Sequence, residues 1–115
     1  MTELSRVGLL AELPGEQLSR LAQRMRREEV GPGKPLLREG DDGDRFYVIL
    51  NGLFSVTQEQ RGLRRILKPG DYFGEVALTM DLPRTASVSP MTLATVASCD
   101  RETFDELIRP LFAEG

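Results

Sequence analysis

The sequence predicts a mainly β fold, an antiparallel β-roll of the jelly-roll type with one helix before it and one helix after it. The chain has 115 residues, which suits one domain with one core. From about residue 29 to 99, short apolar runs are separated by Gly, Asp and Pro, as in β-barrels and β-rolls. Helical periodicity dominates the two ends instead. This order of elements argues against a parallel sheet with crossover helices.

The first helix is expected from Pro14 to about Arg27. Its apolar residues recur at i, i+3, i+4 and i+7 and therefore share one face. These residues are Leu18, Leu21, Ala22 and Met25. Pro14 suits the first turn and Glu16 suits the positive end of a helix. The polar side carries Arg20, Arg24, Arg26 and Arg27, which form either an ordinary solvated face or a surface for a partner or a nucleic acid.

The β region follows the helix-breaking sequence GPGKP at 31–35. The runs RFYVIL and LFSVTQEQ flank Asn51-Gly52, and we expect a β-hairpin there because Asn and Gly tolerate positive φ. RGLRRIL is a further strand in which Leu63 and Leu67 alternate against Arg65, and a Pro-Gly turn follows it. TASVS and TLATVAS, rich in Thr and Val, complete the predicted strands.

The C-terminal helix is expected to begin at Asp100, a good N-cap residue. Pro110 should end it near Arg109 with a bend, because proline lacks the N–H that a helix requires. The apolar face of this helix consists of Phe104, Leu107, Ile108 and Leu111. The expected single domain over 1–115 therefore has a helical part over about 1–28, a β-roll over about 29–99 and a C-terminal helix over about 100–115.

Composition excludes several kinds of site. The chain has no histidine, which removes histidine base chemistry and any metal site built from histidine or several cysteines. Cys99 is the single cysteine and is expected to be a packed thiol in a reducing, cytoplasmic compartment. The net charge of −3 gives no global attraction to nucleic acid or to an anionic membrane. No apolar run approaches the ~18 residues of a membrane span, and the N-terminus is a poor secretory signal.

One stretch, FGEVALTMDLPRTASV at 73–88, combines an acid and a base among small residues. Gly74 allows a close approach of the backbone, and the short helix-compatible segment after it begins with free N–H groups that suit an anion. Arg84 offers a planar fork of donors that matches a phosphodiester. Glu75, when ionised, only accepts hydrogen bonds, so a hydroxyl is its natural partner. Taken singly, Glu75 also suits a helix start and Arg84 a surface turn, but together they indicate a ligand with a phosphate and a nearby hydroxyl.

This stretch resembles the phosphate-binding cassette of cyclic nucleotide-binding domains. That family includes regulatory subunits of cyclic-AMP-dependent kinase, cyclic-nucleotide-gated channels and bacterial catabolite activators. The matching residues are Phe73, Gly74, Glu75, Ala77, Leu78, Pro83, Arg84, Thr85, Ala86 and Val88. EGDDGDRFYVILNG and KPGDYFGE extend the resemblance over nearly the whole chain. It implies a regulatory module rather than an enzyme, with cAMP as the first ligand to expect and cGMP as the alternative.

The resemblance also implies a role for individual residues. Glu75 would accept from the ribose 2′-OH, and Arg84 would pair with the cyclic phosphate. Gly74, Ala77 and Thr85 or Ala86 would present backbone N–H groups to the phosphate. The Thr85 hydroxyl would add about 1 kcal/mol at most in favour of guanine, which does not settle the base. The full expected ligand-binding set is Phe73, Gly74, Glu75, Val76, Ala77, Leu78, Pro83, Arg84, Thr85 and Ala86.

The mechanism that the resemblance implies is a switch. Phosphate binding would tighten the cassette, and Val76 and Leu78 would shift their packing against the C-terminal helix. That helix would swing about a hinge near Arg109 and Pro110. The candidate switch or lid residues are Leu107, Ile108, Leu111 and Phe112. Output is expected to pass through an effector domain or a partner protein.

Two other functions compete with this interpretation. The same β-roll with an empty pocket would be a protein–protein interaction module that docks through its basic helix or its C-terminal helix. Intact Glu75 and Arg84 argue against that module, because a domain without a ligand has no need of both. An enzyme of the cupin type is the third hypothesis, and the absence of histidine and of a metal-ligand cluster argues against it.

Overall fold

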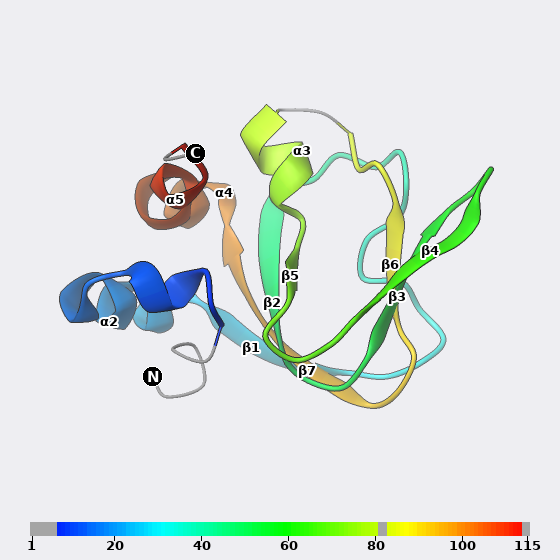
Figure 1. Cartoon of the computed structure of the whole chain (residues 1–115), viewed down its shortest axis with the longest axis horizontal. Coiled ribbons are helices and arrows are strands. Elements are labelled where there is room, and N and C mark those ends of the chain that lie inside the picture. Colours follow the sequence, from blue (N-terminus) through cyan, green and yellow to red (C-terminus); the bar gives the residue numbers. More distant parts are fainter. Residues whose placement is uncertain (1–6, 81–82, 114–115) are drawn as a thin grey trace.

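The computed structural model describes residues 7–80 and 83–113 and shows two antiparallel sheets with helices packed on one side (Figure 1). The first sheet has the strand order β1 (Arg26–Val30), β7 (Ala94–Asp100), β2 (Arg45–Asn51) and β5 (Tyr72–Phe73). The second sheet has the order β4 (Gly62–Leu67), β3 (Phe54–Gln58) and β6 (Ser87–Pro90). The helical segments are η1 (Leu10–Glu12), α2 (Gly15–Arg24), α3 (Glu75–Met80), α4 (Arg101–Thr103), η2 (Phe104–Ile108) and α5 (Arg109–Ala113). The predicted β-roll with flanking helices is confirmed.

Strand β2 of the first sheet is buried on both faces, which explains why FYVIL at 46–50 is apolar without a break. Phe46 and Val48 of β2 face the helices, whereas Tyr47 and Ile49 face the interior of the roll. The helix-side core also contains Leu18 and Leu21 of α2, Leu78 of α3, and Phe104, Leu107 and Ile108 of η2. Cys99 is buried in the same core, and burial raises the pKa of its thiol to about 12. The prediction of a packed thiol is therefore confirmed.

The predicted hairpin at Asn51-Gly52 is wrong. β2 pairs with β7 on one edge and β5 on the other, so it has no edge left for β3. The chain instead crosses from the first sheet to the second, where β3 pairs with β4 and β6. Gly52 does adopt the expected positive φ, 90°, but it serves this crossing. A hairpin instead joins β3 to β4, with the Arg61 N–H donating to the Gln58 carbonyl at 2.9 Å.

Strand β4 contains a register shift that decides which residues face the roll. Arg65 pairs with Val56 and Leu67 pairs with Phe54, so both face inward. The shift between Val56 and Thr57 then places Leu63 opposite Thr57. Leu63 is 60% exposed, whereas Leu67 is 2% exposed. The expected alternation therefore holds for Leu63 against Arg65, but Leu67 shares a face with Arg65.

The first helix is shorter than predicted. It ends at Arg24, and Met25 already has extended backbone angles (φ −91°, ψ 145°). Arg26–Val30 then pairs antiparallel with β7, from Arg26 opposite Ser98 onward. Pairing with a buried strand overrides the helical pattern at this end. Arg26 and Arg27 therefore belong to a strand and not to the basic face of the helix.

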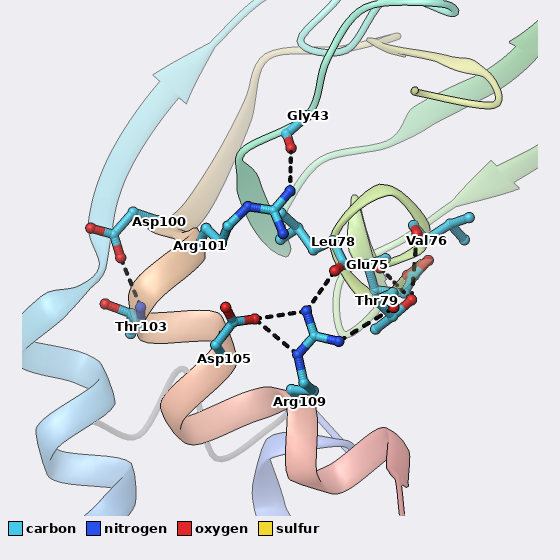
Figure 2. A network of polar contacts seen from close by, with 10 residues as sticks. All are labelled: Gly43, Glu75, Val76, Leu78, Thr79, Asp100, Arg101, Thr103, Asp105 and Arg109. Atoms are coloured by element: carbon cyan, nitrogen blue, oxygen red, sulfur yellow. Dashed lines mark hydrogen bonds and ion pairs between the residues drawn. The ribbon is translucent and has the colours of Figure 1, made fainter. Parts of the chain in front are cut away.

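The C-terminal helix begins as predicted, with the Asp100 carboxylate accepting from the Thr103 N–H at 2.9 Å (Figure 2). The predicted end near Arg109 is wrong, because the helix continues through Pro110 to Ala113. η2 is a wide π turn, in which the Arg109 N–H donates to the Phe104 carbonyl. The wider turn shifts the carbonyls that a regular helix would place against the proline ring. Among the described residues, no helix is long and apolar enough to span a membrane.

Candidate functional site

A pocket of about 230 Å³ lies between α3 and the inner face of the second sheet. The start of α3, both strands of the β3–β4 hairpin, and the segment that leads into β6 contribute to it. The lining residues are Leu37, Val56, Arg65, Leu67, Tyr72, Phe73, Gly74, Glu75, Val76, Arg84, Thr85, Ala86 and Val88. The pocket therefore gathers residues from both sheets and from the cassette segment.

Seven of the ten residues predicted to bind ligand line this pocket: Phe73, Gly74, Glu75, Val76, Arg84, Thr85 and Ala86. Leu78 does not, because it is fully buried in the helix-side core. Pro83 is exposed and is not part of the lining, and Ala77 lies within α3. Val76 was expected to pack against the C-terminal helix, but it lines the pocket and is 37% exposed. Val76 and Leu78, two positions apart in α3, thus lie on opposite faces of the helix, one toward the pocket and one toward the core.

Arg84 is the most constrained charged residue of the pocket. Its backbone is held on both sides by the turn at 40–41: the Arg84 N–H donates to the Asp41 carbonyl, and the Gly40 N–H donates to the Arg84 carbonyl, both at 2.8 Å. Its guanidinium donates from Nη1 to the Gly74 carbonyl and from Nη2 to the Arg45 carbonyl, both at 2.9 Å. The side chain is only 6% exposed. Backbone and side chain together fix the fork at the pocket.

Two glycines make room for this guanidinium. A Cβ at Gly43 would lie 2.3 Å from Cζ of Arg84, so no other residue fits there without displacing the side chain. A Cβ at Gly74 would lie 2.8 Å from the Arg45 carbonyl oxygen and 3.1 Å from Nη1 of Arg84. Gly74 also has a φ of 96°, which L side chains rarely adopt. The close approach that the sequence predicted at Gly74 is present.

The electrostatic state of Arg84 suits an anion. Burial lowers the pKa of its guanidinium, and the phenol of Tyr47 and the carboxylates of Asp44 and Glu75 oppose that shift. Within residues 7–80 and 83–113, no carboxylate forms an ion pair with Arg84, and its hydrogen-bond partners are neutral carbonyls. A buried cation of this kind gains strongly from an anionic partner that enters the pocket.

Glu75 opens α3 and faces the same pocket. Burial raises the pKa of its carboxyl, whereas backbone N–H groups at Glu75 and Val76 and the cations of Arg65 and Arg84 act to lower it. The carboxylate is thus partly desolvated and surrounded by donors. It can accept one further hydrogen bond from a hydroxyl in the pocket.

Six lining residues are absent from the ligand-binding set expected from the sequence: Leu37, Val56, Arg65, Leu67, Tyr72 and Val88. Arg65 is the most informative of them, because it places a second guanidinium opposite α3. Its signal in the sequence was an arginine two positions before the buried Leu67, on the same face of the strand. Leu37 gave no such signal, because it reaches the pocket through an isolated bridge to Val88.

The residues expected to form a lid lie against the helix-side core. Leu107 and Ile108 are buried in that core, and Leu111 and Phe112 are partly buried against it. Phe112 packs against a lining residue of the pocket, because its ring forms a T-shaped pair with Tyr72 at 5.7 Å between centroids. In the described part of the chain, no three His, Cys, Asp or Glu residues cluster as a metal would require.

Comparison with known proteins gives a consistent result. The family model of the cyclic nucleotide-binding domain matches residues 27–110. A cAMP-dependent protein kinase regulatory subunit of Yarrowia lipolytica is 38% identical over 109 residues, covering 94% of this chain and 29% of the relative. The cGMP-dependent protein kinase egl-4 of Caenorhabditis briggsae is 39% identical over 114 residues, covering 94% of this chain and 15% of the relative.

A solved structure shows the same likeness. The regulatory domain of Toxoplasma gondii PKA, crystallised with cAMP, superposes with a TM-score of 0.88 at 25% identity, covering 98% of this chain and 44% of that one. The chain spans less than a third of the length of both curated relatives. The family match is to a binding domain, as the sequence predicted. The chain belongs to the family of cyclic nucleotide-binding domains.

Proposed function

We propose that this chain binds a cyclic nucleotide in the pocket beside α3 and acts as a regulatory sensor module. One observation carries the proposal. Arg84 is a buried cation whose fork meets only neutral carbonyls among the described residues, and it shares its pocket with the Glu75 carboxylate. A ligand with an anionic phosphodiester and an adjacent hydroxyl satisfies both groups at once.

In the proposed complex, Arg84 pairs with the cyclic phosphate and Glu75 accepts from the ribose 2′-OH. Backbone N–H groups around Gly74, Ala77 and Thr85 or Ala86 contact the phosphate. The pocket volume of about 230 Å³ suits the ribose and phosphate. The purine would then extend along the walls formed by Arg65 and Tyr72, both of which reach the lining from other strands.

The base is proposed to be adenine first and guanine second. The Yarrowia relative is cAMP-dependent and the Toxoplasma structure contains cAMP, whereas egl-4 is cGMP-dependent. Two residues of the pocket favour guanine: the Thr85 hydroxyl, and the Arg65 guanidinium, whose donors match the O6 and N7 acceptors of that base. The comparison of the two nucleotides therefore belongs in the first experiment.

That experiment is titration calorimetry of the purified domain with cAMP and cGMP, with 5′-AMP as the control. Saturable binding of a cyclic nucleotide, without binding of 5′-AMP, supports the proposal and ranks the two bases. Absence of heat and of thermal stabilisation at millimolar ligand would overturn it. That result would favour an interaction module with an empty pocket, although Arg20 and Arg24 of its expected docking helix already pair with Glu106.

Glu75→Gln is expected to weaken cyclic nucleotide binding by about 1.5–3 kcal/mol, because a charged acceptor for the 2′-OH is lost. The matched ligand is the 2′-deoxy analogue, which lacks the hydroxyl. The parent protein should lose affinity for this analogue, and Glu75→Gln should lose little more. If the parent and Glu75→Gln lost equal affinity when the ligand lacks its 2′-OH, Glu75 would not be the partner of that hydroxyl.

The same substitution should change how stability depends on pH. Burial in the folded protein raises the pKa of Glu75 above the ordinary value of 4.5. Near and above that pH, the native state therefore binds more protons than the unfolded state. The stability that protonated Glu75 contributes is therefore complete below its pKa in the unfolded chain. It is lost as the pH rises through its pKa in the folded protein. Glu75→Gln should remove this loss, so its unfolding free energy should exceed that of the parent more at pH 7 than at pH 4. Denaturant unfolding at the two pH values measures this, and an equal difference at both would contradict it.

A further inference from the structure

The short helix α3 is held at both ends by arginines from other elements. At its beginning, the Gly74 carbonyl accepts from Arg84, and Glu75 faces the pocket. At its end, Arg109 donates from Nη2 to the Leu78 carbonyl at 2.6 Å and from Nη1 to the Thr79 carbonyl at 3.3 Å (Figure 2). The carbonyls of a last helical turn have no partner within their own helix, so a cation there supplies one.

The Arg109 guanidinium is itself fixed by the C-terminal helix. Asp105, one turn earlier, accepts from Nε at 2.9 Å and pairs with Nη2 at 2.8 Å. The guanidinium also lies 5.7 Å from the centre of the Phe104 ring. Figure 2 shows the contacts with Asp105, Leu78 and Thr79 converging on the Arg109 side chain between the two helices. Arg109 therefore connects the carboxyl end of α3 to η2 and α5.

We infer that Arg109 is a positioning residue, which sets α3 for ligand binding and supplies the contact through which the switch implied by the family resemblance reaches the C-terminal helix. α3 has only six residues, so its first and last turns move together. A ligand that holds the end carrying Gly74 and Glu75 also holds the Leu78 and Thr79 carbonyls to which Arg109 donates. By reciprocity, the bond to Arg109 favours the arrangement in which the pocket is formed. This inference rests on the proposed function for the identity of the ligand.

The same helix carries a second ionic anchor that leads away from the pocket. Glu106 pairs with Arg20 of α2, and it accepts from Arg24 of α2 at 2.8 Å. None of these three residues lines the pocket. Two residues three positions apart in the C-terminal helical region thus form separate anchors: Arg109 contacts α3 beside the pocket, and Glu106 contacts the N-terminal helix α2. Glu106→Gln is therefore a matched control, since it removes an anchor of the same helix without touching α3.

The test compares Arg109→Met and Glu106→Gln with the parent by amide hydrogen exchange and by calorimetry with cAMP and cGMP. In the free protein, Arg109→Met should speed exchange of residues 75–80 about tenfold, and Glu106→Gln should leave it unchanged. The Kd of Arg109→Met should rise about tenfold. At saturating nucleotide, residues 101–113 should gain protection in the parent and in Glu106→Gln but not in Arg109→Met. Arg109→Lys should restore part of this gain, because an ammonium still donates to the two carbonyls.

Three results would overturn the inference. The first is parent-like exchange of 75–80 in Arg109→Met, and the second is an equal rise of Kd in Glu106→Gln. The third is a lower melting temperature of Arg109→Met with full ligand-induced protection of 101–113, which is the behaviour of a residue that only stabilises the fold. A parent that binds no cyclic nucleotide would overturn the proposed function instead. Amide hydrogen exchange of residues 75–80 in the free protein would still test whether Arg109 positions α3. Faster exchange in Arg109→Met would support this role, and parent-like exchange would overturn it.

Discussion

Arg84→Ala is expected to weaken cyclic nucleotide binding by about 2–4 kcal/mol, which corresponds to a rise in Kd of about 30-fold to nearly 1,000-fold. The side chain is buried, and its fork is fixed before the ligand arrives by the Gly74 and Arg45 carbonyls. Little conformational entropy is therefore lost on binding, and the charge-assisted pair with the phosphate forms away from bulk water. Titration calorimetry with cAMP and cGMP measures the loss.

Two further variants separate geometry from charge. Arg84→Lys should recover only part of the affinity, because an ammonium lacks the planar fork that matches two phosphate oxygens. Arg64→Ala removes an equal charge from β4 at an exposed position outside the pocket lining, and its affinity should stay close to that of the parent. If Arg84→Ala bound cyclic nucleotide as tightly as the parent, the phosphate would have to lie elsewhere.

A thermal melt accompanies these titrations because Arg84 also contributes to the fold. Its removal leaves the carbonyls of Gly74 and Arg45 without their partner, which costs about 1–3 kcal/mol when such groups are buried. The variant should therefore melt below the parent while keeping its far-ultraviolet circular dichroism. If the variant is folded at the titration temperature, its loss of affinity is due to the missing contact with the ligand and not to unfolding.

The central part of the site could be predicted from the sequence because it is local. Gly74, Glu75 and Arg84 lie within one run of sixteen residues at 73–88, and their chemistry can be stated without knowledge of the fold. Arg65 and Leu37 come from other strands, and only strand pairing brings them to the pocket. Arg109 was expected near a hinge, yet its bond to α3 depends on how two separate helices pack.

The errors in the fold have the same origin. The alternating pattern identified the strands but did not specify their partners. The sequence therefore predicted that β2 pairs with β3, although the two strands belong to different sheets. Likewise, the proline rule at Pro110 assumes a regular helix, and the wide turn of η2 removes that assumption. Local rules therefore predicted which segments are strands and helices, whereas tertiary packing decided how they connect and where they end.

Gly52→Ala is expected to cost about 2–4 kcal/mol of unfolding free energy, since it combines backbone strain with a clash. Gly52 has a φ of 90°, and a Cβ there would lie 2.4 Å from the Cβ of Ala94 and 2.7 Å from its Cα. Ala94 begins β7, a central strand of the first sheet, and it is 4% exposed, so it cannot move aside cheaply. Unfolding in urea, followed by circular dichroism, measures the loss.

Gly33→Ala is the control that separates the two contributions. Gly33 has a φ of 117°, but a Cβ there would meet no atom within 4 Å. Its replacement should therefore cost only the strain of positive φ, about 1 kcal/mol. If the two variants lost equal stability, the contact of Gly52 with Ala94 would carry no energy, and the crossing between the sheets would tolerate any residue able to adopt positive φ. A larger loss at Gly52 means instead that the crossing requires glycine for its size. In that case the glycine that suggested a hairpin is required for another reason, because the chain packs closely against β7 where it crosses between the sheets.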